Sequence, residues 1–317
     1  MKCNTGFQVE EQSTSPFEGI MGESDLAPDV VRSFQKSIYH YYRENGRAFP
    51  WRTTHNPYHI LVSEIMLQQT QTERVAEKYG QFINAFPDFR SLAKAPLREV
   101  LLLWQGLGYN RRAVALKEIA RTVMTKFHGN LPSSLDDLMS LPGIGRATAS
   151  AISAFSFNEP TVFIETNIRR VFIHHFFENE NSIRDTEILP LVEKTLDTSN
   201  PRKWYYALMD YGVMLKKQHR NPNRKSAHYQ RQSPFEGSNR QIRGMILKIL
   251  VMKANVSEQE IVRRLKINPE RVRKNLVQLQ KEGFIEKKGN RFTIAEKDVN
   301  QWEPGDKSLD LKGGSRV

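Results

Sequence analysis

The chain has 317 residues and a formal net charge of +12, with 47 lysines and arginines against 35 aspartates and glutamates. This excess suits a polyanionic partner, although charge by itself says nothing about the fold. No apolar run reaches the roughly 18 residues of a membrane-spanning helix, and the N-terminus has no apolar signal core. Cys3 is the single cysteine, which excludes internal disulfides and any four-cysteine cluster.

Composition divides the chain into five parts. Residues 1–28 carry five acidic residues against one lysine, which predicts a disordered acidic tail. Helical periodicity predicts a domain at residues 29–230, followed by a linker at 231–237. A separate module is predicted at residues 238–296, and residues 297–317 are expected to form a second disordered tail.

The predicted domain at 29–230 is mainly α, because it has no convincing run of alternating strand residues. We expect Asp29 to cap its first helix. A second helix after Asn56 and Pro57 is apolar except for Glu64, which four-residue spacing would place on one face with Gln68. A glutamate on a core-facing position is costly unless it is paired or functional, whereas a solvent-facing one needs no special role.

A glycine-containing turn follows the short apolar helix around Leu138. Its sequence is Leu-Pro-Gly-Ile-Gly, residues 141–145, and a small-residue helix begins at Arg146. Pro142 fixes one backbone torsion, while Gly143 and Gly145 permit turns that leave the next N–H groups open. A phosphate oxygen fits such a helix start, and Arg146 adds positive charge there. The alternative for a bare Gly-x-Gly is an ordinary helix–helix turn.

The basic run at residues 215–231 contains no acidic residue, which favours either a linker or an edge that contacts phosphates. The module at 238–296 has fourteen basic and six acidic residues. Ser257 and Glu260 predict a capping box, and Asn268 with Pro269 predicts the start of a third helix. A two-strand hairpin around Gly289 completes the pattern of a winged helix, a form of helix-turn-helix. A protein-binding winged helix is the alternative to a DNA-binding one.

The string from Leu141 to Ala149 resembles the helix-hairpin-helix element of the base-excision DNA glycosylases, the superfamily that includes endonuclease III and the MutY adenine glycosylases. Further stretches between about residues 40 and 215 are similar to the MutY proteins in particular. These stretches are Phe49-Pro50-Trp51, Pro57-Tyr58, Ser63–Gln71, Leu103–Tyr109, Asn167–Val171 and Ala207–Gly212.

The resemblance implies two catalytic carboxylates. Glu64 matches the glutamate that protonates adenine and assists the attack of water. Glu165 falls where the family has the aspartate that stabilises an oxocarbenium-like sugar, and Asn167 matches the neighbouring asparagine. Without the resemblance, Glu165 would be interpreted only as a helix cap.

The resemblance also implies residues that contact DNA. A segment inserted beside the lesion, a loop and the hairpin supply these contacts, and the third helix of the winged helix is expected to add more. The predicted set is Gln68, Gln69, Thr70, Tyr109, Asn110, Arg111, Gly143, Gly145, Arg146, Arg271, Arg273 and Lys274. The predicted base pocket consists of Trp51, Arg52, Tyr206 and Asp210.

The chain departs from the MutY pattern at several places. Glu165 replaces the aspartate, and Ala147 stands where bifunctional members have their Schiff-base lysine. This implies a monofunctional hydrolase. The cysteine quartet that follows the last helix in the family is missing, so no iron–sulfur cluster is expected. Asn110 stands where many MutY proteins have a second tyrosine, and the winged helix replaces the domain that senses 8-oxoguanine.

The implied fold is a two-lobed helix-hairpin-helix glycosylase, with Glu64 and Glu165 facing each other in a DNA-binding cleft, followed by the small α+β winged helix. The leading hypothesis is removal of adenine mispaired with guanine or 8-oxoguanine in double-stranded DNA. The alternatives are a thymine or uracil glycosylase acting on G·T or G·U pairs, and a catalytically silent DNA-binding factor. We expect a monomer that contacts no membrane and, in a prokaryote, is cytoplasmic and associated with the nucleoid. No cofactor is expected beyond a monovalent cation at the hairpin.

Overall fold

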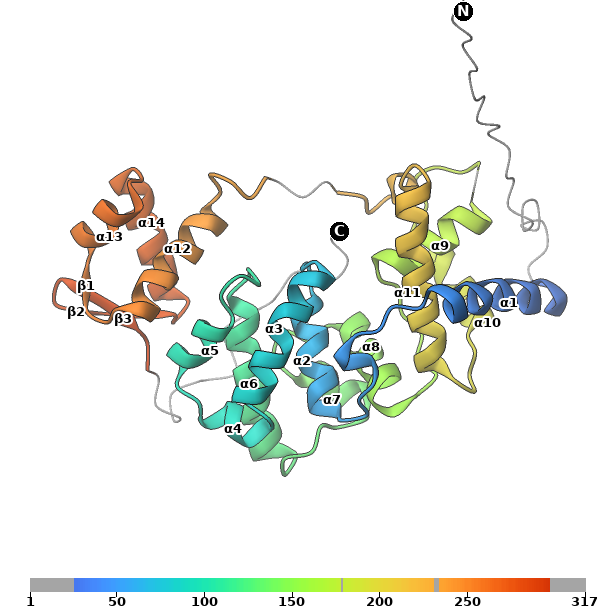
Figure 1. Ribbon diagram of the computed structural model, residues 1–317, viewed down its shortest axis with the longest axis horizontal. Coiled ribbons are helices and arrows are strands. Elements are labelled where there is room, and N and C mark those ends of the chain that lie inside the picture. Colours follow the sequence, from blue (N-terminus) through green and yellow to red (C-terminus); the bar gives the residue numbers. More distant parts are fainter. Residues whose placement is uncertain (1–25, 178, 231–233, 297–317) are drawn as a thin grey trace, which may run out of the picture. The chain divides into compact units, whose positions relative to one another are not determined.

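The computed structural model describes residues 26–177, 179–230 and 234–296 (Figure 1). The predicted tails therefore lie almost entirely outside the described residues, as does part of the linker. The chain divides into two compact units. Unit 1 joins the residues up to Gly46 to Ile164–Tyr229, and unit 2 joins Arg47–Phe163 to the residues from Gln230 onward. The sequence did not indicate that the first helix belongs with the segment after residue 163.

Unit 1 is built from helices, and its core is aromatic. Phe34 makes edge or tilted ring contacts with Phe172, Phe176 and Trp204, at centroid distances of 5.3–5.9 Å. Helix α9 (Thr166–Phe176) packs on α11 (Pro201–Gln218), as Figure 1 shows. The elements of this unit are α1 (Pro28–Asn45), α9 (Thr166–Phe176), α10 (Asp185–Thr195), α11 (Pro201–Gln218) and the 3-10 turn η2 (Pro222–Lys225).

The structure contradicts one local prediction for unit 1 and one of the two alternatives given for another. The cap residue of α1 is Ala27, and Asp29 lies inside the first turn of the helix. The linker alternative for the basic run at 215–231 is wrong at residues 222–226, because Pro222, Asn223 and Ser226 are buried. The alternative of an edge that contacts phosphates stays a prediction. The side chain of Asn223 donates to the carbonyl oxygen of Thr166 at 2.9 Å, so this segment supports the start of α9.

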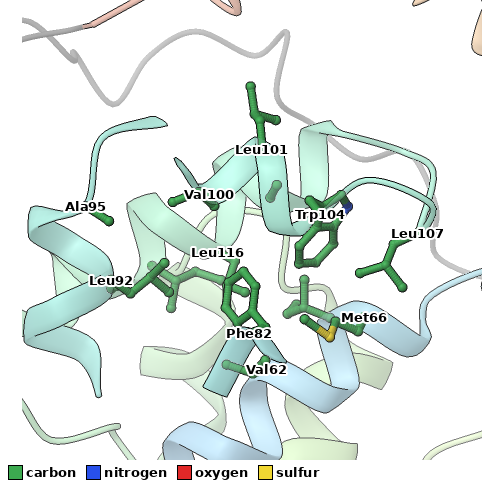
Figure 2. Packing of buried hydrophobic residues seen from close by; sticks show 14 of the residues in the cluster. Val62, Met66, Phe82, Leu92, Ala95, Val100, Leu101, Trp104, Leu107 and Leu116 are labelled. Atoms are coloured by element: carbon green, nitrogen blue, oxygen red, sulfur yellow. The ribbon is translucent and has the colours of Figure 1, made fainter. Parts of the chain in front are cut away.

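Unit 2 contains a helical part and the winged-helix module. The helical part consists of η1 (Pro50–Arg52), α2 (Pro57–Leu67), α3 (Thr72–Ala85), α4 (Phe89–Lys94), α5 (Leu97–Leu103), α6 (Arg111–Lys126), α7 (Leu135–Ser140) and α8 (Arg146–Phe157). Figure 2 shows its core, in which Trp104 and Phe82 lie among aliphatic side chains that include Met66 and Leu116. The rings of Phe82 and Trp104 meet edge to face at 5.9 Å.

The helix-hairpin-helix element is α7, the turn at 141–145 and α8. Ser134 caps α7, and its side chain accepts a hydrogen bond from the amide of Asp137 at 3.1 Å. Gly143 has a φ of +77°, a conformation that favours glycine. Between residues 26 and 230, the described backbone is helical apart from irregular connections and one isolated bridge between Ile183 and Ser226. The predicted mainly α fold class is confirmed.

The C-terminal module is a winged helix, as predicted. Its elements are α12 (Asn239–Met252), β1 (Val256–Ser257), α13 (Glu258–Leu265), α14 (Pro269–Lys281), β2 (Ile285–Lys288) and β3 (Arg291–Ile294), with strand order β1-β3-β2. Asn268 caps α14 as expected. Ser257 caps α13, whereas the carboxylate of Glu260 pairs with Lys253 and Arg264 rather than completing a capping box.

In the part of the chain that the structure describes, no helix combines the length and the apolar character that crossing a membrane requires.

Candidate active site

In unit 1, the carboxylate of Glu165 is held at the N-terminus of α9. It accepts hydrogen bonds from the backbone amides of Asn167 at 2.7 Å and Ile168 at 3.0 Å, and from the side-chain amide of Asn167 at 3.2 Å. Burial raises the pKa of Glu165, while these amides and the charges of Arg170 and Arg169 oppose the rise. Glu165 is therefore a helix cap and also a carboxylate held in place by Asn167, the asparagine predicted beside it.

Arg170 connects this carboxylate site to α11. Its Nη1 donates to the Asn167 side-chain oxygen at 2.6 Å and to the Gly212 carbonyl oxygen at 2.7 Å. Its Nε donates to the side chain of Asn221 at 3.1 Å. A Cβ atom on Gly212 would lie 2.5 Å from the Asn167 carbonyl oxygen, so the backbones of the two helices meet here with no room for a side chain. The motifs at 167–171 and 207–212 thus build one site.

Glu64, in unit 2, lies on α2 among buried residues that include Val62, Ile65 and Met66, and it is itself half-buried. The prediction that Gln68 continues this helical face is wrong, because α2 ends at Leu67 and Gln68 is its C-cap with a ψ of 111°. Glu64 and Glu165 belong to different units, so their opposition across a cleft stays a prediction.

Arg112 organises the end of α2, a role that sequence reasoning missed. Its side chain is almost fully buried, at 2% exposure. Its Nη1 donates to the carbonyl oxygens of Ile65 at 3.0 Å and Met66 at 2.9 Å, and to that of Gln68. Such a cation favourably meets the carbonyls at a helix C-terminus. Burial lowers the pKa of Arg112 to about 10, which leaves the guanidinium charged at neutral pH.

The same guanidinium ties two loops together. Its Nη2 donates to the hydroxyl of Thr70 at 2.9 Å and to the carbonyl oxygens of Leu107 at 2.8 Å and Gly108 at 3.2 Å. The Thr70 hydroxyl in turn donates to the Leu107 carbonyl oxygen at 3.1 Å. The segment at 68–70 and the loop at 106–110, which the sequence predicted separately as DNA contacts, are therefore one structural element. The signal available in the sequence was the arginine directly after the Gly-Leu-Gly-Tyr-Asn-Arg string.

Gln69 forms the exposed tip of this element. Its φ is +54°, an unfavourable conformation for a residue other than glycine, and such strain often accompanies functional loops. The side chain of Gln68 donates to the hydroxyl of Thr148 on α8 at 3.4 Å, which links the tip to the hairpin. Tyr109 also has a positive φ, of +41°. Asn110 is the N-cap residue of α6, and Arg111 begins that helix.

The hairpin turn is open toward solvent at the start of α8. Gly145, Arg146 and Ala147 are exposed, and no side chain caps the helix. The first N–H groups of a helix have no partner within it. Gly145 has an ordinary φ of −88°, and a Cβ there would meet nothing within 4 Å. Neither the backbone conformation nor the neighbouring atoms therefore require glycine at 145, although glycine is among the residues favoured at a helix N-cap.

The four predicted pocket residues divide between the units. Trp51 is buried in unit 2, where it stacks on Phe49 at 4.9 Å and meets Tyr79 edge to face at 5.3 Å. Arg52 donates to the Arg47 carbonyl oxygen at 3.0 Å. Tyr206 and Asp210 are buried on α11 of unit 1. Their shared role in a base pocket stays a prediction.

The basic residues of α14 are exposed, as the predicted DNA-facing helix requires. Two of them also make contacts inside the module. Arg271 donates to the Gly237 carbonyl oxygen at 2.7 Å, and Arg273 pairs with Glu258 at 2.9 Å. Lys274 is also exposed.

The described residues thus form a helix-hairpin-helix protein with a C-terminal winged helix. A model of the HhH-GPD superfamily base excision DNA repair proteins matches residues 62–194, and a model of the TFIIE alpha subunit matches residues 235–304. An adenine DNA glycosylase of Mycolicibacterium smegmatis is 32% identical over 230 residues, which are 66% of this chain and 78% of the relative. The chain therefore belongs to the HhH-GPD superfamily.

An adenine DNA glycosylase of Buchnera aphidicola subsp. Baizongia pistaciae is 38% identical over 187 residues, which cover 57% of this chain and 52% of the relative. This chain spans about half the length of the first curated relatives that it matches. The solved structure of a thermostable thymine-DNA glycosylase superposes with a TM-score of 0.55 at 28% identity, covering 62% of this chain and 91% of that one.

Proposed function

We propose that this protein is a monofunctional DNA glycosylase that hydrolyses the N-glycosidic bond of adenine mispaired with guanine or 8-oxoguanine in double-stranded DNA. The observation that carries the proposal is the Glu165 carboxylate, which two backbone amides and Asn167 hold in place. Loss of a base leaves positive charge on the sugar, and a fixed carboxylate stabilises that charge without having to reorganise.

Glu64 supplies the proton that makes adenine a better leaving group. As the bond to the sugar breaks, the bonding electrons leave with the protonated base. A water molecule then adds its oxygen to the sugar carbon and gives up its proton to Glu64, which restores the acid. Ala147 has no amine to form a Schiff base, so the product is an intact abasic strand.

The segment at 68–70 and the hairpin serve DNA binding. The exposed tip at Gln69, fixed by Arg112, enters the duplex beside the target, while the start of α8 receives a phosphate. The names of the bacterial relatives support adenine as the excised base. The likeness to a thymine-DNA glycosylase, together with Glu165 in place of aspartate, favours thymine or uracil opposite guanine as the second candidate.

Single-turnover base release tests both candidates. Duplexes that carry A·G, A·8-oxoguanine, G·T or G·U pairs are incubated with excess enzyme and then treated with alkali, which cuts abasic sites. We expect release from the two adenine duplexes and no cutting before alkali. Release only from the G·T or G·U duplex would assign the protein to the second candidate, and tight binding without any release would leave a silent DNA-binding factor.

A substitution at Glu64 tests the assignment of the acid. Glu64→Gln keeps the size of the side chain but cannot donate the carboxylic proton, so we expect unchanged DNA affinity and no base release. Glu77→Gln, at an exposed position on α3, is the matched control and should retain the full rate. Release by Glu64→Gln at the wild-type rate would contradict the assignment.

A further inference from the structure

The winged-helix module contacts the start of α6 through a buried carboxylate. Glu282, at the C-terminal end of α14, has a side chain that is only 5% exposed. It accepts hydrogen bonds from Arg111 at 3.0 and 2.6 Å, from Arg243 at 2.5 and 3.2 Å, and from Gln278 at 2.7 Å. Burial acts to raise the pKa of Glu282, but these donors outweigh it and lower the pKa to about 2. The carboxylate is therefore charged at neutral pH.

A second contact reaches the ring of Tyr109. The guanidinium of Arg240, on α12, lies 5.3 Å from the centre of this ring and donates to its hydroxyl. Arg112 lies 5.6 Å from the same centre. A guanidinium over an aromatic ring is attracted to it and restricts its motion. One of these two cations belongs to the helical part of unit 2 and the other to the winged helix.

These contacts act on the loop that Arg112 joins to the segment at 68–70. Glu282 holds Arg111, Arg240 holds Tyr109, and the backbone between them continues into Arg112. A third contact supports the same arrangement, because Arg98 on α5 donates to the Val251 carbonyl oxygen of α12 at 2.7 Å. The module is thus connected by charged hydrogen bonds to the element expected to enter DNA.

We propose that Glu282 and Arg240 of the winged-helix module are positioning residues that fix the loop at 106–110 and, through Arg112, the Gln69 tip that enters the duplex. A segment that enters the base stack must be held rigidly if its contact energy is to compensate for unstacking the bases. The module then promotes base flipping and does more than add phosphate contacts. This inference rests on the proposed function, because flipping is a step in base release.

An inhibitory role for Glu282 would give a different result. If Glu282 mainly withheld Arg111 from a DNA phosphate, removal of the carboxylate would tighten binding and increase flipping. If Glu282 positions the loop, its removal weakens flipping and leaves the affinity for an undamaged duplex nearly unchanged.

The test is the fluorescence of 2-aminopurine placed next to the target adenine, recorded in the milliseconds before base release. With full-length Glu282→Gln and with Arg240→Ala, we expect the flipping equilibrium to fall about tenfold, the size of one charge-assisted contact. The affinity for a fully paired duplex should change less than about twofold. Glu260→Gln, in an ion pair elsewhere in the module, is the matched control and should flip like the wild type. In the free protein, amide hydrogen exchange of residues 106–112 should become faster in Glu282→Gln and in Arg240→Ala, but not in Glu260→Gln.

The outcomes separate this inference from the proposed function. Normal release with unchanged flipping in Glu282→Gln overturns the positioning role alone, as does tighter binding with increased flipping. Normal flipping with no base release by the wild type overturns the proposed function alone. Reduced flipping and faster exchange in both variants, against an unchanged control, supports the positioning role.

Discussion

Gly212 lies where α11 meets the start of α9, and Gly212→Ala tests whether this close approach positions the carboxylate site. A Cβ at 212 would lie 2.5 Å from the Asn167 carbonyl oxygen and 2.8 Å from the Asn167 Cβ, whereas ordinary contacts begin at 3.4 Å. The start of α9 must therefore retreat by about 1 Å. That shift acts on Asn167, on its hydrogen bond to Glu165, and on the bond from Arg170 to the Gly212 carbonyl oxygen.

A displacement of this size at a reacting group costs about 100-fold in rate, so we expect single-turnover base release to slow by that factor. Overpacking of the helix contact should also lower the free energy of unfolding by about 1–3 kcal/mol, measured by urea denaturation. Gly80→Ala is the matched control, because Gly80 is also helical and a Cβ there meets nothing within 4 Å. The control should retain the wild-type rate and be slightly more stable. Release by Gly212→Ala within about threefold of wild type, with unchanged stability, would refute the close-approach argument.

Three further predictions concern other parts of the chain. Arg112→Lys leaves several carbonyl oxygens at the end of α2 without their donor, and should lower the free energy of unfolding by about 3 kcal/mol in urea titrations. Burial, and then the charges of His174 and His219, lower the pKa of His175 from 6.5 to about 3. The neutral ring therefore contributes its full stability above pH 6.5, and this contribution is lost as the pH falls from 6.5 toward 3. About 1.4 kcal/mol is lost at pH 5.5, and His175→Leu should flatten this pH dependence of the free energy of unfolding in a series of denaturation experiments. Lys274→Ala should reduce the slope of log affinity against log salt by about 1; an unchanged slope would contradict a DNA-facing α14.

The local elements were predictable from sequence because their signals lie within a few residues of the structure they specify. Asn268 and Pro269 start α14, since an amide side chain satisfies the first N–H groups and proline needs no donor there. Gly143 adopts the left-handed turn that its position in the hairpin implied. Periodicity also distinguished the helical region from the winged helix, because core-facing apolar residues recur every three or four positions in helices and alternate in strands.

Errors appeared where a boundary or a role depends on distant residues. Gln68 was expected on the face of α2, but the helix ends one residue earlier, where Arg112 binds its last carbonyl oxygens. One interpretation of the basic run at 215–231 was a linker, but Asn223 is buried and bonds to the start of α9. Arg112 is far in sequence from the end of α2, and Thr166 is far from Asn223, so the local sequence pattern could not predict either contact.

The sequence alone therefore determined that the region before the winged helix is mainly helical, that a hairpin turn lies at residues 141–145, and that a winged helix follows. Only the tertiary structure decided that the first helix belongs with residues 164–229, that Arg112 unites two loops, and that Glu282 holds Arg111. The physical reason is the distance along the chain over which each kind of interaction acts. Capping and periodicity act over a few residues, whereas a buried guanidinium or carboxylate takes its partners from whichever segments the folded core brings within hydrogen-bonding distance.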